Sequence, residues 1–300
     1  MSPLPAFIDP ADKPMSRPQD AATLAERLLA LPGFENAARI YCRSYLLGEP
    51  GDEPGRKLMH QHARYLTAFL LIRNYYAWRD GGGPPATLSL LKSLSGLSRR
   101  HTANLVSALR AGKLVEDEAV PGDRRGKALR PAPGLIYSVG RSPLCFAELA
   151  DRLDPARPPR GPRLRQEADA LGRLVRASGD YVAANQSILA AFPTILRMTE
   201  LDCGYEVLLA VMEAHYGRNN GAETPPLSHQ TLSRRFGIST SHAGNIVAAL
   251  KQRKLLELTP RGQFVALDPA LAAEFHRWCA AQAAHTMLLF DGPLAGQISR

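Results

Sequence analysis

The sequence lacks the signatures of several large protein classes. Its four cysteines are widely separated, with no C-x-x-C pair and no Cys/His cluster at the spacing of a metal site. No apolar run reaches the roughly 18 residues that cross a bilayer, and the N-terminus does not resemble a signal peptide. P-loop, H-E-x-x-H and serine-elbow motifs are also missing. We therefore expect a cytoplasmic protein with reduced thiols, which is not an enzyme, needs no cofactor or metal and does not enter a membrane.

The charge balance points to an acidic partner. The chain of 300 residues carries a formal net charge of +9, and its hydrophobic content of 45% is enough for two domains with separate cores. Such a charge favours a polyanion such as nucleic acid, although an acidic protein or a membrane face would also attract it.

An internal repeat is the strongest signal in the chain. Residues 84–116 align with residues 225–257 without a gap. The identical pairs include Pro84/Pro225, Pro85/Pro226, Leu91/Leu232, Gly96/Gly237, Ser98/Ser239, His101/His242, Asn104/Asn245, Val106/Val247, Leu109/Leu250, Lys113/Lys254, Leu114/Leu255 and Glu116/Glu257. A repeat of this length indicates that a whole supersecondary unit has been duplicated.

Each copy predicts two helices followed by a hairpin. In the first copy Thr87 is placed to cap a helix over 88–94, Gly96 makes a turn, and Ser98 caps a helix that ends near Gly112. Strands are expected at 113–118 and 128–130 around a basic turn, and at 255–258 and 263–267 in the second copy. An aromatic-rich helix over 57–78 precedes the first pair, and an apolar helix over 204–216 precedes the second. This order is typical of a winged helix.

The remaining segments divide the chain into regions. We expect a disordered arm over 1–20, a first winged-helix domain with flanking helices over 21–153, a solvated Pro/Arg-rich linker over 154–165 and a second such domain over 166–300. Within the first domain, Ser142-Pro143 is predicted to start a helix. The fold class is mainly α with small β-hairpin wings, the two winged helix-turn-helix domains being related by a pseudo-two-fold axis.

With these motifs in place, the two cores resemble the winged helix-turn-helix of the MarR family of bacterial transcription regulators. The likeness covers 232–257 and the stretch from Leu91 through the basic turn, in which Asp123 and Arg125 match the family's Asp-x-Arg wing signature. It implies a double-stranded DNA partner and a wing arginine that approaches the minor groove. Members are usually about half this length and work as dimers, so this chain would be a single-chain pseudo-dimer, monomeric and nucleoid-associated. The second wing keeps only Arg261.

The candidate DNA-binding residues lie on the predicted recognition helices and wings. In the first helix the inward set is Leu97, Thr102, Leu105, Val106 and Leu109, and Ala103 is expected to face outward with the polar residues. The candidates are Arg99, Arg100, His101, Asn104, Ser107, Arg124, Arg125 and Lys127 in the first copy and Thr240, Ser241, His242, Asn245 and Arg261 in the second. The two histidines are expected to contact phosphates or their own domain. The two asparagines either contact adenine or make a hydrogen bond within the motif.

The predicted function is a sequence-specific transcription regulator, more specifically a repressor that binds a non-palindromic site. Two alternatives stay open. A plasmid-type replication initiator also carries two winged helices on one basic chain, and tandem winged helices also serve as protein-interaction modules. The sequence does not identify a small-molecule effector.

Overall fold

The computed structural model describes residues 18–47, 58–185, 187–219, 221 and 224–291, apart from the side chains of Pro18 and Arg124. Most of the arm expected over 1–20 lies outside this range, and its last three residues begin the first helix. In chain order the helices are α1 (Pro18–Leu29), α2 (Phe34–Leu47), α4 (His62–Arg79), α5 (Leu88–Leu94), α6 (Arg99–Ala111), α7 (Pro133–Leu153), α8 (Gly161–Gln166), α9 (Ala168–Asn185), the 3₁₀ turn η1 (Ile188–Ala191), α10 (Pro193–Glu200), α11 (Gly204–Asn219), α12 (His229–Phe236), α13 (Thr240–Gln252) and α14 (Pro269–Asp291).

The described chain is mainly helical, with strands confined to two antiparallel hairpins. One hairpin pairs β1 (Val115–Val120) with β2 (Asp123–Pro131), and the other pairs β3 (Leu256–Leu258) with β4 (Phe264–Leu267). Among the residues described, no helix combines the length and the apolar character needed to cross a membrane.

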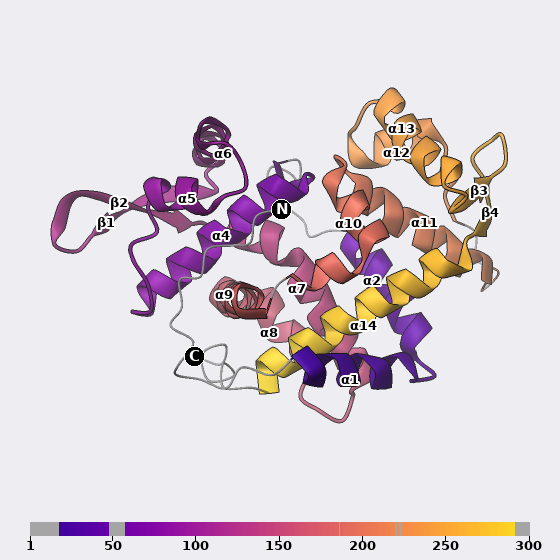
Figure 1. Ribbon diagram of the computed structural model, residues 1–300, viewed down its shortest axis with the longest axis horizontal. Helices are drawn as coiled ribbons and strands as arrows, with labels where there is room; N and C mark the ends of the chain where they lie inside the picture. The colour runs from indigo at the N-terminus through magenta and orange to yellow at the C-terminus, as the bar shows by residue number, and fades with distance from the viewer. Residues whose placement is uncertain (1–17, 48–57, 186, 220, 222–223, 292–300) are drawn as a thin grey trace.

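The same order of elements occurs twice (Figure 1). We call α4, α5, α6, β1 and β2 the first unit, and α11, α12, α13, β3 and β4 the second unit. Within each unit the two short helices pack on one another and the hairpin packs on the unit's first helix. Most predicted boundaries of these elements agree with the structure to within three residues. The basic turn expected before 128 is wrong, because β2 begins at Asp123 and pairs with β1 across most of that stretch. Helix α4 begins at His62, five residues after the predicted start, which lies outside the described residues.

Local conformations recur at equivalent positions of the two units. Ser98 caps α6 and Ser239 caps α13, each accepting a hydrogen bond from the amide three residues later. After each helix a lysine adopts a left-handed conformation, with φ of 56° at Lys113 and 57° at Lys254. The next residue then donates its amide back to the helix, from Leu114 to Leu109 at 2.8 Å in the first unit. This is the Schellman arrangement, which satisfies the last carbonyls of a helix.

The turn between the paired helices differs from the expectation in one unit. Gly237 is left-handed, with φ of 66°, as a glycine turn requires. Gly96 does not have a positive φ. Its turn is held instead by the hydroxyl of Ser95, which accepts the amide of Leu97 at 3.1 Å and bonds the hydroxyl of Thr102 at 2.7 Å.

The helices that flank the two units are exchanged between them. Helix α2 precedes the first unit in sequence but packs on α11 of the second, whereas α9 precedes the second unit and packs on α4 of the first. Helices α4 and α9 can approach closely because Gly172 has no side chain: a Cβ at this position would lie 2.2 Å from the ring of Tyr76. The two hydrophobic cores therefore do not follow the division at 154–165 that the sequence suggested.

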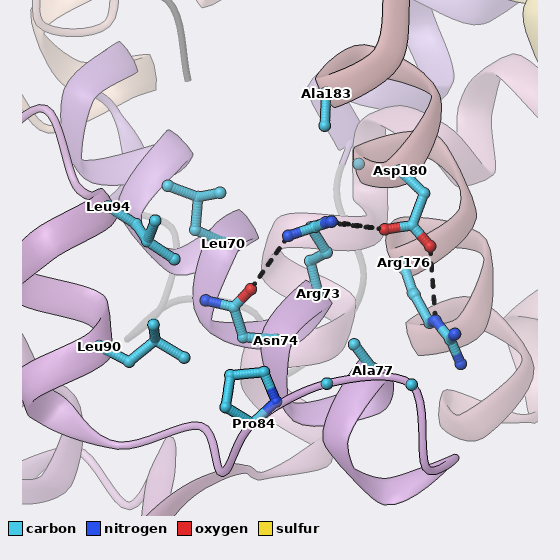
Figure 2. A pocket seen from close by; sticks show the side chains of 13 residues that line it. Leu70, Arg73, Asn74, Ala77, Pro84, Leu90, Leu94, Arg176, Asp180 and Ala183 are labelled. Atoms are coloured by element: carbon cyan, nitrogen blue, oxygen red, sulfur yellow. Dashed lines mark hydrogen bonds and ion pairs between the residues drawn. The ribbon is translucent and has the colours of Figure 1, made fainter. Parts of the chain in front are cut away.

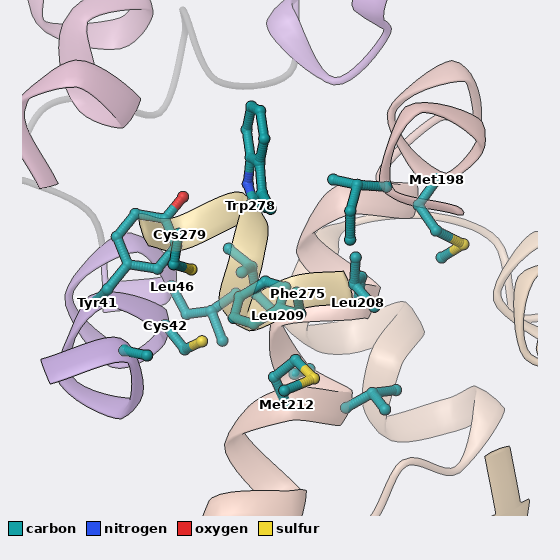
Figure 3. Packing of buried hydrophobic residues seen from close by; sticks show 14 of the residues in the cluster. Tyr41, Cys42, Leu46, Met198, Leu208, Leu209, Met212, Phe275, Trp278 and Cys279 are labelled. Carbon is teal, nitrogen blue, oxygen red and sulfur yellow. The ribbon is translucent and has the colours of Figure 1, made fainter. Parts of the chain in front are cut away.

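The second unit shares its core with helices from both ends of the chain (Figure 3). Tyr41 of α2 stacks on Phe146 of α7 with ring centroids 4.4 Å apart, and its hydroxyl bonds the hydroxyl of Tyr205 on α11 at 2.6 Å. The indole of Trp278 on α14 donates to the same Tyr205 oxygen at 3.1 Å. Burial raises the pKa of Tyr41 well above its ordinary value, so the phenol stays protonated and can donate.

Helix α7 joins the two cores, and its length contradicts the helix start predicted at Ser142-Pro143. The helix is continuous from Pro133, with Pro143 inside it. A proline leaves the carbonyl four residues earlier without its helical donor. In this fold the hydroxyl of Tyr65 on α4 donates to that carbonyl, Val139, at 3.3 Å. A tertiary contact thus supplies the hydrogen bond that the local sequence removes.

The Pro/Arg-rich segment is also more ordered than expected of a linker. Residues 161–166 form α8, and Leu164 is buried. The carboxylate of Asp151 accepts the backbone amides of Arg160 and Gly161, both at 2.8 Å, and pairs with the Arg160 guanidinium at 3.0 Å. These bonds fold the segment back onto α7. Further along the chain, Pro193 begins α10 just after η1.

Helix α14 packs a buried histidine, His285, against α9. The Nε2 atom of His285 lies 3.0 Å from the hydroxyl of Ser178 on α9, and its ring lies against Tyr181 with centroids 4.5 Å apart. Burial lowers the pKa of His285 from 6.5 to about 4. The neutral ring is therefore the form that the fold accommodates.

This burial predicts acid destabilisation. Between pH 6.5 and pH 4 the unfolded chain binds a proton at residue 285 that the folded chain excludes, so stability falls as pH falls through this window, by up to about 3 kcal/mol. In urea unfolding, His285→Gln should lower stability at pH 7 but weaken the decline toward pH 4. His276 shares the same pKa direction, so part of the decline should remain. His101→Gln, at an exposed position, is the control, and an unchanged decline in His285→Gln would contradict the assignment.

Candidate nucleic-acid interface

The second short helix of each unit lies at the same edge of the molecule. In Figure 1, α6 and α13 lie along the upper edge, with the β1–β2 hairpin extending to one side and β3–β4 to the other. Helices α1 and α14, which pack on each other, lie toward the opposite edge. The molecule therefore presents two helices along one edge, with a hairpin toward each end of it.

Helix α6 has one buried apolar face and one exposed face that carries charged and polar side chains. Thr102, Leu105, Val106 and Leu109 are buried as predicted, and Leu97 in the preceding turn is half-buried. The side chains of Arg99, Arg100, His101, Asn104 and Ser107 are exposed, whereas Ala103, expected to face outward, is half-buried. In the part of the chain that the structure describes, Arg99, Arg100 and Asn104 make no side-chain hydrogen bond or ion pair. His101 Nδ1 bonds the capping hydroxyl of Ser98 at 3.0 Å.

The first hairpin carries its own charge pairs. Asp117 on β1 accepts Arg110 of α6 at 2.5 Å and lies 3.6 Å from Lys127 on β2. The hydrogen bond from Arg110 holds the pKa of the Asp117 carboxyl below its ordinary value. Arg130 is similarly paired with Glu116 across the strands. Lys127 is therefore partly neutralised within the hairpin.

Asp123 and Arg125, the pair that matched the wing signature, have separate roles in this geometry. The carboxylate of Asp123 accepts the backbone amide of Arg125 at 2.9 Å, which fixes the start of β2 after the turn at Gly122. The Arg125 side chain is exposed. The side chain of Arg124 lies outside the described residues. The aspartate thus shapes the hairpin, and the arginine supplies charge.

Helix α13 presents a more polar and less charged surface. Thr240, Ser241 and Asn245 are exposed, as is Arg261 on the short second hairpin. His242 is half-buried instead, and its Nε2 bonds the backbone oxygen of Asp202 at 2.8 Å. That contact with its own unit is one of the two roles expected for the residue. Exposed basic side chains near this helix occur at its end, at Lys251, Arg253 and Lys254.

A cavity of about 200 Å³ lies beside α5, between α4 and α9 (Figure 2). Leu70, Leu90 and Leu94 line one side. On the other side, Arg73 bonds Asp180 at 2.8 Å. Because this arginine is already paired and the volume is below that of most ligand pockets, the cavity does not identify an effector.

Sequence spacing did not reveal one cluster of possible metal ligands. His60, just before α4, lies beside Asp202 and Cys203 in the turn between α10 and α11. One ligand atom from each residue falls within 4.8 Å of the others. A separation of more than 140 positions in the chain concealed this cluster, since only tertiary packing brings the two segments together.

Comparisons with known proteins add no further constraint. No protein-family model, curated protein or solved structure matches the chain. The repeat within the chain and the surface that the two units present are therefore the observations that bear on function.

The recurrent left-handed lysines give a direct test of the helix ends. Glycine adopts this conformation without the Cβ penalty of about 1 kcal/mol, whereas a β-branched residue is worse than lysine. In urea unfolding, Lys113→Gly should leave the free energy of unfolding unchanged or raise it by up to about 1 kcal/mol, and Lys113→Val should lower it. Lys92→Gly, inside α5, should instead lower it by about 1 kcal/mol. A loss in Lys113→Gly as large as in Lys92→Gly would refute the assigned conformation.

Proposed function

We propose that the two units are winged helix-turn-helix domains and that the chain is a transcription regulator, more specifically a repressor, that binds double-stranded DNA as a single-chain pseudo-dimer. Helix α6 would enter one major groove and α13 the next. The observation that carries the proposal is the exposed pair Arg99 and Arg100 at the N-terminal end of α6, on the edge that also presents α13.

The position of these arginines suits base and phosphate contacts. Residues in the first turns of a recognition helix reach base edges, and arginine bonds guanine bidentately. Because these guanidinium groups have no intramolecular partner among the described residues, DNA binding would not break an existing ion pair. Asn104 is exposed one turn further along the same helix and is placed to bond an adenine.

The exchange of flanking helices supports the pseudo-dimer. Each unit packs its first helix against a helix that belongs, by sequence order, to the other. Separating the units would expose apolar surface of both cores, so their relative position is held by the hydrophobic effect. A fixed relative position is what a protein needs to place two helices in consecutive grooves, about 34–36 Å apart. The resemblance to the MarR family is in keeping with this arrangement.

The exposed arginine surface favours this proposal over the protein-interaction alternative, since duplex DNA is a polyanion that such a surface fits. The replication-initiator alternative uses the same surface on repeated origin sequences. The two differ in which DNA is bound, and a genome-wide map of binding sites distinguishes promoters from an origin.

Removing Arg99 and Arg100 from α6 should weaken DNA binding and reduce its salt dependence. Arg99→Ala/Arg100→Ala is expected to lower affinity for a duplex by about ten- to a hundredfold and to reduce the slope of log K against log salt by about 1 to 2. Fluorescence anisotropy at several salt concentrations measures both. Arg27→Ala/Arg43→Ala removes the same charge from exposed positions on α1 and α2 and should change neither appreciably. Equal affinities for the two double variants would rule out α6 as the DNA-binding helix.

The unequal helices predict an asymmetric binding site. Selection of bound duplexes from a random library should return two different half-sites, because α13 has threonine and serine where α6 has two arginines. The half-site read by α6 should be richer in guanine and should lose its preference in the Arg99→Ala/Arg100→Ala variant. A perfectly palindromic consensus would contradict this prediction.

A further inference from the structure

We propose that His60, Asp202 and Cys203 bind a divalent transition-metal ion of the zinc type, and that this ion links the segment before α4 of the first unit to the second unit. The three residues supply a nitrogen, an oxygen and a sulfur, and this mixed donor set favours zinc over the hard cations magnesium and calcium. A water molecule would complete a tetrahedral shell.

The geometry of the cluster is close to what a metal requires. His60 Nδ1 lies 2.8 Å from Cys203 Sγ and 3.9 Å from the nearer carboxylate oxygen of Asp202. Metal–ligand bonds of about 2.0–2.3 Å in a tetrahedron place ligand atoms about 3.3–3.6 Å apart. The nitrogen and sulfur would therefore separate by less than about 1 Å when a cation replaces the thiol proton.

Burial holds two of the three ligands in place, while the third is open to solvent. Cys203 is fully buried and the His60 side chain is only 7% exposed, so both atoms are held by their surroundings. The Asp202 side chain is 42% exposed and gives a cation access from solvent. These are conditions under which a cation can enter and then be held by ligands with little freedom to move.

The turn that carries two of the ligands is fixed by its backbone. Cys203 has φ of 56°, a conformation that glycine adopts more readily, and Gly204 follows it where a Cβ would lie 2.1 Å from the Met198 oxygen. His242 holds the turn from the other side through the Asp202 backbone oxygen. The ligand positions are thus set by α10, α11 and α13 together.

The site contacts both short helices of the second unit. Cys203 Sγ lies 3.9 Å from the backbone oxygen of Phe236, at the end of α12, and the turn bonds His242 of α13. His60 comes from the chain just before α4 of the first unit. A bound ion would therefore limit movement of α13 relative to α4. Its effect on DNA binding rests on the proposed function, whereas metal binding does not.

Cobalt provides a direct test because a thiolate bound to Co²⁺ gives a charge-transfer absorption in the near ultraviolet. The reduced, chelator-treated full chain should take up one Co²⁺ with this absorption, and Zn²⁺, but not Mg²⁺, should displace it. Cys203→Ser should abolish the absorption, and His60→Gln and Asp202→Asn should weaken Zn²⁺ binding at least tenfold. Cys145→Ser removes another buried thiol, on α7, and should bind as the original chain does.

Circular dichroism of the metal-free variants shows whether each has folded, and Asp202→Asn changes a partly exposed side chain that is least expected to disturb folding. Absence of thiolate absorption in the original chain would overturn the metal site, as would folded His60→Gln and Asp202→Asn variants that bind Zn²⁺ as tightly as the original chain.

Anisotropy with a selected duplex then measures the coupling between zinc binding and DNA binding. Zinc should change DNA affinity at least threefold in the original chain and not in His60→Gln. Equal affinity with and without zinc overturns the coupling alone, and absence of any DNA binding overturns the proposed function while the cobalt result stands.

Discussion

The exchange of α2 and α9 between the two units is the constraint on which the rest of the structure depends. The hydrophobic core around each unit includes buried residues of helices from outside that unit. The exchanged helices complete both cores, and α7 contributes residues to each. The position of each unit is therefore tied to that of the other.

This constraint explains why unusual local features are tolerated. Pro143 lies inside α7 because Tyr65, from α4, donates to the carbonyl that the proline leaves without a partner. Gly172 on α9 allows that helix to approach the ring of Tyr76 on α4. In both cases a contact between helices compensates for a residue that would weaken an isolated helix.

The two units repeat one order of elements but carry different side-chain chemistry. The helix caps and the left-handed lysines recur, since these residues set the backbone. Several exposed positions differ: α6 carries two arginines without intramolecular partners in the described structure, while α13 carries hydroxyls, although the exposed Asn104 and Asn245 are the same residue in both. The second unit instead has the cluster around Cys203, at the point where its turn meets the segment before α4. The units thus differ both in exposed side chains and in the buried cluster beside the second one.

The sequence by itself determined the local structure of the two units. Capping serines, the apolar spacing of α6 and α13 and the repeat predicted their helices and hairpins, because these depend on neighbours within a few residues. The exposure of Arg99, Arg100 and Asn104 followed from the same spacing. Tertiary structure alone decided the exchange of α2 and α9, the order of the Pro/Arg-rich segment, the continuity of α7 and the meeting of His60 with Cys203. These depend on contacts between segments far apart in the chain, which no local pattern encodes.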